Sequence, residues 1–305
     1  MAKVTILGAG AWGSALATLA QNQQNQVRVW SRQSSDSLEC LLSDTEIIIS
    51  AVSMKGVVSL VEKIKELSLP PDIILVTATK GLDPVTTSTP STLWQKAFSQ
   101  NHVVVLSGPN LSQEIEKGLP AATVAASVNI DAAKRIQEVF SSDRFRVYVN
   151  TDPLGTELGG TLKNVFAIAA GVCDGLQLGT NAKSALLTRA LPEMMRVGTT
   201  LGGQIETFYG LSGLGDLLTT CNSPLSRNYR VGEGLAQGKS LDQVLEDLQS
   251  TAEGVNTTNV LMEIANRQNI EVPIAYQVYR LLNGKISPQQ AVTALMERTL
   301  KPESL

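Results

Sequence analysis

Short apolar runs alternate with amphipathic stretches along the first half of the chain. Apolar, β-branched runs occur at residues 4–7, 27–30, 46–52, 73–77 and 103–107, with helical patterns between them at 12–21, 55–67 and 89–98. The apolar runs are almost continuous, which is typical of parallel strands covered by helices on both faces. This order predicts a doubly wound α/β sheet, which residues 121–127, a helix near 132–140 and residues 147–149 complete.

From about residue 152 the strand signals nearly disappear. Helical patterns follow at residues 154–174, 182–201, 241–248, 257–268 and 274–282, and glycine-rich breaks at 202–203 and 210–215 separate some of them. Pro192 lies inside the second of these patterns, where it would kink or split a helix. We therefore expect two domains, an α/β sheet domain at residues 1–151 and an all-helical domain at residues 152–305.

Size and charge permit two buried cores and exclude some classes of partner. The chain has 305 residues, 43% of them hydrophobic, and a formal net charge of -3. This charge provides no electrostatic footprint for nucleic acid or for an anionic membrane surface, so we expect neither as a partner. The longest apolar stretch, residues 165–173, is too short to span a bilayer.

The cysteines and the single histidine limit the chemistry further. Cys40, Cys173 and Cys221 are far apart and show no metal-binding or CxxC spacing, which favours reduced thiols in a cytoplasmic protein. His102 lies at a predicted turn before an apolar strand, so we expect a surface role for it. A serine-histidine-aspartate mechanism and a metal site are therefore not expected.

A glycine-rich loop follows the first predicted strand and opens the first predicted helix. It reads Gly8-Ala9-Gly10-Ala11-Trp12-Gly13, which is the strand, loop and helix context that a dinucleotide fingerprint requires. Gly8 permits the tight turn, Gly10 lets the backbone approach a pyrophosphate, and Gly13 permits close packing of helix and strand. The loop predicts a Rossmann-type dinucleotide-binding domain.

The end of the second predicted strand distinguishes between the two nicotinamide cofactors. An acid there would bind a ribose 2′-hydroxyl, whereas an arginine would accommodate a 2′-phosphate. The chain has Ser31 and Arg32 there and no acid until Asp36. Arg32 can pair bidentately with a phosphate and Ser31 can donate a hydrogen bond, so we expect NADPH in preference, with NADH as a further donor. The alternative is that Arg32 is only a solvated turn residue.

Candidate binding and catalytic residues occur at two strand ends and on one predicted helix. Lys80 follows the fourth strand and the stretch Ser107-Gly108-Pro109-Asn110 follows the fifth, where ligands of open α/β sheets gather. Lys163 lies on a helix among small and apolar neighbours, where a desolvated lysine could donate a proton to a ketone oxygen. The alternatives are a solvated loop lysine at position 80 and a lysine that extends past the helix edge at position 163.

Residues 223–229 predict a helix start, with Ser223 as the N-cap and Pro224 at the first helical position. Ser226, Arg227 and Asn228 could then bind a phosphate through free N–H groups and a charge-assisted fork. The alternative is an ordinary capped helix with an exposed arginine. Asp216, in a glycine-rich segment just before it, could bind a substrate hydroxyl, orient Lys163 or simply cap a helix.

Taken in order and nearly from end to end, these motifs resemble the bacterial-type NAD(P)-dependent glycerol-3-phosphate dehydrogenases. The resemblance rests on residues 8–13, 78–81, 107–109, 159–164, 213–217, 226–228 and 253–254. It implies reduction of dihydroxyacetone phosphate to sn-glycerol 3-phosphate, which supplies glycerophospholipid synthesis in the cytoplasm. It also implies a homodimer.

The resemblance assigns the site residues, together with the glycine loop and the turn after the second strand. Lys163 would transfer the proton. The expected substrate contacts are Lys80, Gly108, Asn110, Lys163, Asp216, Ser226, Arg227 and Asn228. The expected cofactor contacts are Gly8, Gly10, Ala11, Trp12, Gly13, Ser31, Arg32, Lys80, Ser112, Arg227 and Glu253.

The chain departs from the family's pattern at three places. Only about fifteen residues, 31–45, join the second and third strands, where the family usually has a longer segment that would contact the adenine side. Asn110 stands where the family more often has threonine or serine, although asparagine can still donate to a phosphate or hydroxyl. Ser53-Met54-Lys55 replaces a more usual Pro-Ser start.

Two other functions fit parts of the pattern. One is a reductase of another small acid or phosphate, of the ketopantoate or hydroxyacid type, against which the phosphate clamp at residues 226–228 argues. The other is a non-catalytic NADP-binding sensor. The joint presence of Lys163, Asp216 and Arg227 argues against a sensor, because a sensor needs no proton donor.

Overall fold

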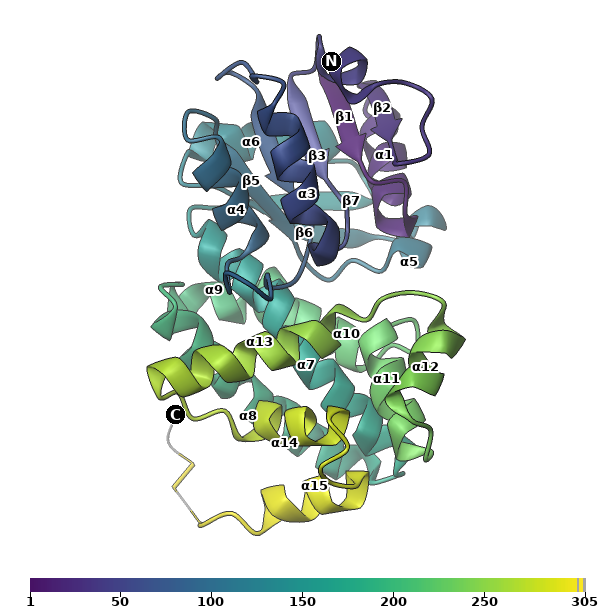
Figure 1. Ribbon diagram of the computed structural model, residues 1–305, viewed down its shortest axis with the longest axis vertical. Helices are drawn as coiled ribbons and strands as arrows, with labels where there is room; N and C mark the ends of the chain where they lie inside the picture. The colour runs from purple at the N-terminus through teal and green to yellow at the C-terminus, as the bar shows by residue number, and fades with distance from the viewer. Residues whose placement is uncertain (301, 304–305) are drawn as a thin grey trace. The chain divides into compact units, whose positions relative to one another are not determined.

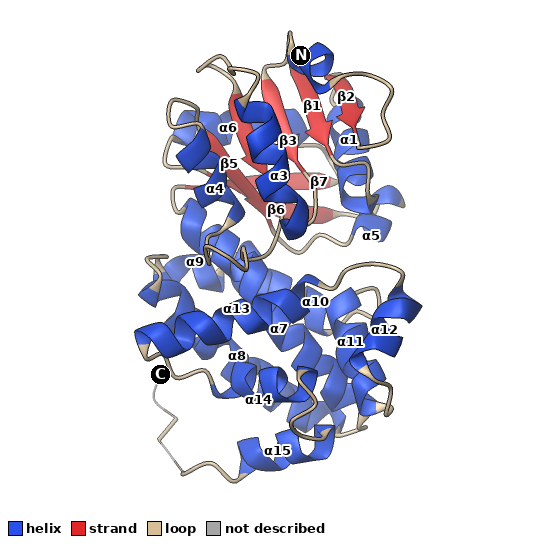
Figure 2. Ribbon diagram, viewed as in Figure 1, coloured by secondary structure: helices blue, strands red, loops and turns tan. Residues whose placement is uncertain are grey.

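The computed structural model describes residues 1–300 and 302–303 of the chain. The chain divides into two compact units, Met1–Leu158 and Gly159–Leu305. Every strand of the described residues lies in the first unit, and the described part of the second unit contains helices but no strand (Figure 2). The predicted fold class, a Rossmann-type sheet followed by helices, is confirmed. The exact boundary between residues 151 and 152 stays a prediction.

The first unit is built around a seven-stranded sheet with the strand order β2-β1-β3-β4-β5-β6-β7. Its elements are β1 (Lys3–Leu7), α1 (Ala11–Asn22), β2 (Gln26–Trp30), α2 (Leu38–Leu42), β3 (Ile47–Ser50), α3 (Met54–Lys65), β4 (Ile74–Thr77), α4 (Pro90–Ala97), β5 (Val103–Ser107), α5 (Ser112–Glu116), β6 (Ala121–Ala126), α6 (Ile130–Phe140) and β7 (Phe145–Asn150). Strands β1 to β5 are parallel, whereas β6 pairs antiparallel with β5 and parallel with β7.

Strand β6 reverses direction after residues 108–120, a connection that is long enough for a crossover but forms little helix. Between β5 and β6 the chain forms only the five-residue helix α5. The sequence pattern indicated parallel strands for the first five runs, as observed, but it gave no direction for residues 121–127 and so did not show this reversal.

Two apolar clusters, one on each face of the sheet, form the core of the first unit. Successive side chains of a strand point to opposite faces, so Ile47 and Ile49 of β3 join the cluster beneath α1 and α6, whereas Ile48 joins the cluster beneath α3 and α4. Figure 1 shows these helices on the two sides of the sheet. This arrangement explains why the strands are apolar along almost their whole length.

The second unit consists of packed helices. Helix α7 (Pro153–Gly175) begins before the unit boundary, and it is followed by α8 (Gly179–Thr200), α9 (Ile205–Tyr209), the π-helical turn η1 (Leu211–Gly215), α10 (Asp216–Cys221), α11 (Arg227–Ala236), α12 (Leu241–Leu248), α13 (Glu253–Gln268), α14 (Pro273–Leu282) and α15 (Pro288–Met296). Helix α8 contains Pro192 and is not split there. None of the described helices is both long and apolar enough to cross a membrane.

A buried acid joins α8 to α14. Glu193 is 2% exposed, and its carboxylate accepts hydrogen bonds from the backbone N–H groups of Ile274 at 2.9 Å and Ala275 at 2.8 Å. The carboxylate therefore satisfies two of the donors that every helix leaves unpaired at its N-terminus. Burial raises the pKa of Glu193 to about 7 against these hydrogen bonds, which act to lower it.

One helix start differs from the prediction. Helix α11 begins at Arg227 with Ser226 as its N-cap, and the Ser226 hydroxyl accepts from the Tyr229 N–H at 3.2 Å. Ser223 and Pro224 form a preceding turn, in which the Ser226 N–H donates to the Ser223 carbonyl at 3.0 Å. The prediction of Ser223 as the N-cap was wrong because the Ser-Pro signal fits a turn as well as a helix start.

Candidate active site

The three glycines of the loop between β1 and α1 have different structural tasks. Gly8 has φ +124°, a conformation that strongly favours glycine, and a Cβ there would lie 2.7 Å from the Ala51 carbonyl oxygen. A Cβ at Gly13 would lie 1.9 Å from the Gly8 carbonyl oxygen, so α1 packs directly on the loop. At Gly10 no atom lies within 4 Å of a Cβ position. Gly8 and Gly13 are therefore required by packing, whereas Gly10 leaves the backbone open to a ligand.

The first turn of α1 fits a pyrophosphate. Gly10 is its N-cap, and no side chain caps the helix, so its first N–H groups are not satisfied by a cap. A helix N-terminus of this kind binds phosphate oxygens through N–H groups and the helix dipole. Ala11 begins the helix and is exposed, while Trp12 is half-buried and packs on the core cluster beneath α1. The loop thus has the form that a dinucleotide needs.

Lys80 and Gly108 lie together beyond the ends of β4 and β5. The Lys80 Nζ atom donates to the Gly108 carbonyl at 3.3 Å. Gly108 has no room for a side chain, because a Cβ would lie 2.9 Å from the Cα of Thr123 on β6. The strand ends therefore bring two of the three predicted substrate contacts of this unit into one place.

Asn110 and Ser112 continue this edge. The Asn110 Nδ2 atom donates to the Ala122 carbonyl at 2.9 Å, while its Oδ1 atom is buried and has no hydrogen-bond partner among residues 1–300 and 302–303. A buried acceptor without a partner is costly, and a ligand N–H or O–H group could satisfy it. Ser112 is half-buried at the first position of α5.

Lys163 is buried in the second unit in contact with two polar side chains of α10. The residue is 6% exposed, and its Nζ atom lies 3.0 Å from the Asp216 Oδ1 atom and 2.5 Å from the Thr220 Oγ1 atom. The Thr220 hydroxyl also donates to the Asp216 Oδ1 atom at 3.1 Å. Asp216 and Thr220 are four residues apart on one helix, which places both side chains on the same face. Three roles were considered for Asp216, and the contact with the Lys163 Nζ atom supports the orientation of Lys163.

Thr220 is a functional candidate that the sequence reasoning missed. The signal is present in the chain, because Thr220 follows Asp216 by four residues, the spacing of neighbours on a helix face. The contact with Lys163 spans 57 residues, however, and neither pattern nor propensity predicts such a pairing.

Asn164 follows Lys163 on α7 and belongs to the motif at residues 159–164, but the sequence gave it no role. The Asn228 Nδ2 atom donates to the Asn164 Oδ1 atom at 2.9 Å, and the Gly254 N–H donates to the Asn228 Oδ1 atom at 2.9 Å. A Cβ on Gly254 would lie 2.7 Å from the Asn164 carbonyl oxygen, so glycine is required there. These contacts connect α7, α11 and α13. Asn228 is therefore held by the helix that carries Lys163.

Glycines also bring the backbones of α7 and α11 together. A Cβ on Gly171 of α7 would lie 1.9 Å from the Tyr229 carbonyl oxygen, and a Cβ on Gly232 of α11 would lie 1.8 Å from the Ile168 carbonyl oxygen. Each helix thus lacks a side chain where the other helix crosses it. This close packing fixes the start of α11 relative to the middle of α7.

The remaining predicted contacts lie at helix starts. Arg227 is exposed at the first position of α11, and within the described part of the chain its side chain makes no hydrogen bond or ion pair. Glu253 is half-buried at the first position of α13. Ser31 and Arg32 follow β2 in the first unit, Ser31 half-buried and Arg32 exposed. Arg227 and Arg32 therefore offer guanidinium groups that are available to an anion.

The thiol of Cys221, the His102 ring and the acidic side chains were considered as nucleophiles or metal ligands. Burial raises the pKa of the Cys221 thiol to about 12, so the thiolate form is strongly disfavoured. His102 is exposed, and its Nε2 atom lies 3.0 Å from the Asn129 Nδ2 atom. No cluster of three or more histidine, cysteine, aspartate or glutamate side chains suited to a metal occurs in residues 1–300 and 302–303.

Comparison with known proteins agrees with the resemblance noted in the sequence. The family model for the C-terminus of NAD-dependent glycerol-3-phosphate dehydrogenase matches residues 152–293, and the model for the N-terminus matches residues 3–40 and 34–133. The two N-terminal matches overlap in the connection between β2 and β3.

Individual proteins match over nearly the full length. Glycerol-3-phosphate dehydrogenase [NAD(P)+] of Acaryochloris marina is 62% identical over 99% of this chain and 97% of its own. The Synechocystis enzyme of the same name is also 62% identical, over 99% of this chain and 95% of its own. The crystal structure of glycerol-3-phosphate dehydrogenase from Coxiella burnetii superposes with a TM-score of 0.93 at 34% identity, covering 97% of this chain and 99% of that one. The chain therefore belongs to the NAD-dependent glycerol-3-phosphate dehydrogenase family.

Proposed function

We propose that this enzyme reduces dihydroxyacetone phosphate to sn-glycerol 3-phosphate with NADPH as its preferred donor and NADH as a further one. The single observation that carries the proposal is the buried Lys163 ammonium of α7, held by Asp216 and Thr220 of α10, while the start of α11, which presents Arg227 and Asn228, is tied to the same α7 through Asn164. A proton donor and an anion-binding group close to it match a ketone that bears a phosphate.

Lys163 is the proton donor of the reaction. When bound, the nicotinamide supplies the hydride that carbon 2 of the ketone receives. The carbonyl oxygen then takes a proton from the Lys163 Nζ atom, so the carbonyl π bond is replaced by a C–H and an O–H bond. Before that step the charged ammonium polarises the carbonyl, which stabilises the negative charge that develops on oxygen.

Asp216 and Thr220 hold the Lys163 side chain in a fixed orientation. The Asp216 carboxylate lies 3.0 Å from the ammonium and offsets part of the cost of burying its charge. The Thr220 hydroxyl accepts from Lys163 and donates to Asp216, which fixes the direction of the ammonium. In the reverse reaction the neutral amine accepts the proton from the substrate hydroxyl.

The start of α11 is the proposed phosphate clamp. Arg227 provides a planar fork of N–H donors that suits a phosphate. Asn228 uses its amide to tie this turn to Asn164, so its main role is to hold the clamp in place. The Ser226 hydroxyl oxygen caps the helix and keeps its own O–H to donate. Lys80, Gly108 and Asn110 are proposed as further substrate contacts on the first domain.

The cofactor contacts belong mainly to the first domain. We assign dinucleotide binding to residues 1–151, with the pyrophosphate at Gly8, Gly10, Ala11, Trp12 and Gly13 and further contacts from Ser31, Arg32, Lys80 and Ser112. Residues 152–305 are assigned to substrate binding and catalysis, with Arg227 and Glu253 also touching the cofactor. The open backbone at Gly10 supports the first of these assignments.

The cellular setting is proposed from the resemblance and the thiols. Cys173 and Cys221 are buried and free, which suits a reducing compartment. We place the enzyme in the cytoplasm as a homodimer, where its product supplies glycerophospholipid synthesis. The oligomeric state is measured directly by light scattering after gel filtration.

The test measures the oxidation of NADPH with dihydroxyacetone phosphate as substrate. The same assay is run with NADH in place of NADPH, and with unphosphorylated dihydroxyacetone in place of the phosphate. Oxidation that requires the phosphate group supports both the reaction and the clamp. If NADPH binds but is oxidised only with a ketoacid such as ketopantoate, the proposal is wrong and the enzyme is a reductase of another substrate class.

A further inference from the structure

The turn after β2 contains two serine hydroxyls that brace each other. The Ser34 N–H donates to the Ser31 carbonyl at 3.0 Å and closes the turn. The Ser31 N–H donates to the Ser34 Oγ atom at 2.8 Å, and the Gln33 N–H donates to the Ser31 Oγ atom at 3.2 Å. The turn is also adjacent to the glycine loop, because the Gly8 N–H donates to the carbonyl of Trp30, the last residue of β2, at 2.8 Å.

These bonds determine what the two hydroxyls can still do. A serine hydroxyl has one O–H donor and two lone pairs. Each oxygen already accepts a backbone N–H, so each hydroxyl keeps its proton for a further bond. The two oxygens are 3.4 Å apart, at the outer limit of a hydrogen bond, and at most one proton is used between them. The turn therefore presents one or two O–H donors in a fixed place.

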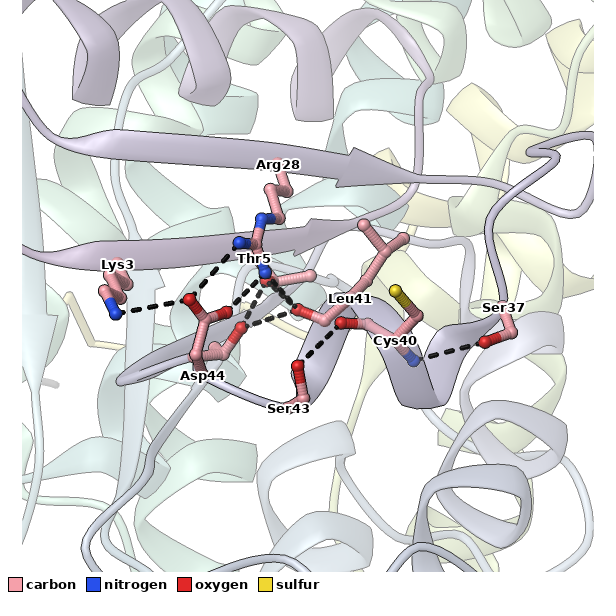
Figure 3. Close-up of polar contacts among 9 residues, drawn as sticks. Lys3, Thr5, Arg28, Ser37, Cys40, Leu41, Ser43 and Asp44 are labelled. Atoms are coloured by element: carbon pink, nitrogen blue, oxygen red, sulfur yellow. Dashed lines mark hydrogen bonds and ion pairs between the residues drawn. The ribbon is translucent and has the colours of Figure 1, made fainter.

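Arg32 lies between the two serines and adds a positive charge. Its side chain is exposed and has no hydrogen bond or ion pair within the described part of the chain. Arg28 on β2 is different, because it forms an ion pair with Asp44 and donates to the Leu41 carbonyl at 3.3 Å (Figure 3). Only Arg32 of these two arginines is available to a ligand.

The connection that follows the turn is short but firmly attached. Asp44 lies between Arg28 and Lys3, whose Nζ atom is 3.2 Å away, and these two cations lower the pKa of the Asp44 carboxyl (Figure 3). Beneath it the Thr5 and Thr45 hydroxyls lie 2.6 Å apart. Helix α2 and the loop after it are thus held against β1 and β2, even though the connection is short.

We propose that Ser34 binds the 2′-phosphate of NADPH together with Ser31 and Arg32, and that Ser34 is a further determinant of cofactor specificity. The proposal rests on the proposed function, since it concerns the cofactor of that reaction. A phosphate monoester carries about -1.5 to -2 charges at neutral pH and three strong acceptor oxygens. The Arg32 fork supplies two donors and the serines supply the others.

NADH gains much less from the same turn. Its ribose has a neutral 2′-hydroxyl, which water solvates well and which Arg32 does not attract. Dehydrogenases that select NADH place an acid at the end of the second strand, whereas this chain has Trp30 and Ser31 there. Loss of the Ser34 hydroxyl should therefore weaken the binding of NADPH much more than the binding of NADH.

The experiment compares Ser34→Ala and Ser34→Thr with the wild type, and Ser35→Ala serves as the matched control. Ser35 is an exposed neighbour whose side chain forms no hydrogen bond among the described residues. For each protein, kcat/KM is measured with NADPH and with NADH. Binding of 2′,5′-ADP and of 5′-AMP is measured by calorimetry, because the two fragments differ only in the 2′-phosphate.

For Ser34→Ala we expect the NADPH-to-NADH ratio of kcat/KM to fall about ten- to a hundredfold, as for a hydrogen bond to a charged group. The preference for 2′,5′-ADP over 5′-AMP falls by a similar factor. Threonine at position 34 restores both ratios because it keeps the hydroxyl, and Ser35→Ala preserves them.

Two results overturn the proposal. One is a Ser34→Ala variant that keeps both wild-type ratios. The other is an equal loss with both cofactors and both fragments, which would mean that Ser34 only supports the turn. If no variant and not even the wild type reduces dihydroxyacetone phosphate, the proposed function fails. The fragment titrations still decide the role of Ser34 in that case, because they need no turnover.

Discussion

Replacing Thr220 with valine removes one hydroxyl from the Lys163 site and leaves the shape of the side chain nearly unchanged. Two hydrogen bonds are lost, the one from the Lys163 ammonium at 2.5 Å and the one to the Asp216 carboxylate at 3.1 Å. Both partners are charged, and hydrogen bonds to charged groups contribute about 1.5–3 kcal/mol each. Lys163 and Asp216 remain paired at 3.0 Å, which offsets part of that loss.

We therefore expect the Thr220→Val variant to unfold with a free energy about 2–4 kcal/mol below the wild type. Its kcat falls about ten- to a hundredfold, because the proton donor is no longer held in one direction. KM for dihydroxyacetone phosphate changes little, since Thr220 contacts the lysine and not the proposed phosphate clamp. The assays are steady-state NADPH oxidation and urea unfolding followed by circular dichroism.

Two controls separate the hydroxyl from the packing. Thr220→Ser keeps the hydroxyl and should recover most of kcat, whereas Thr219→Val makes the same chemical change at the preceding residue of α10. The reasoning is refuted if Thr220→Val has the wild-type kcat and unfolding free energy, or if Thr220→Ser is as impaired as valine.

Two further predictions concern the fold. Gly232→Ala would place a Cβ 1.8 Å from the Ile168 carbonyl oxygen, so the α7–α11 crossing must open, and we expect a loss of about 2 kcal/mol or more and a lower Tm by calorimetry. Gly56→Ala on α3, whose Cβ would meet its nearest atom at 3.5 Å, is the matched control and should be neutral or stabilising. Burial raises the pKa of Glu193 from 4.5 to about 7, so its protonated form stabilises the fold fully below pH 4.5 and that stability is lost as the pH rises towards 7. The Glu193→Gln variant cannot ionise, so it does not lose this stability between pH 4.5 and pH 7. The free energy of unfolding of the variant minus that of the wild type should therefore rise by about 3 kcal/mol over this pH range. A difference that stays constant with pH would contradict the assignment.

Much of the fold could be predicted because its signals are local. The apolar strands, the glycine loop and the long helices each follow from a run of adjacent residues, and the structure has them close to the predicted bounds. Helices α2 and α5 were missed because five residues give no periodicity. The antiparallel direction of β6 was not predicted, because the apolar pattern of a strand does not show which way the strand runs.

The candidate site was predictable in part. Lys163 stood out because a lysine among glycines and apolar residues is unusual, and Asp216 stood out beside its glycines. No role was predicted for Thr220 or Asn164, because their roles come from contacts with residues more than fifty positions away in the chain. Such pairings are set by the crossing of α7 with α10 and α11, which no local pattern encodes.

The most direct test of the central claim is the turnover of a Lys163→Ala variant, measured beside its affinity for NADPH. Lys239→Ala, which removes an exposed lysine of the same unit, is the control. We expect kcat for dihydroxyacetone phosphate to fall by about 10²- to 10⁴-fold, the usual contribution of a general acid, while the Kd for NADPH from fluorescence titration stays near the wild-type value. Turnover equal to that of Lys239→Ala would contradict the assignment of Lys163 as the proton donor.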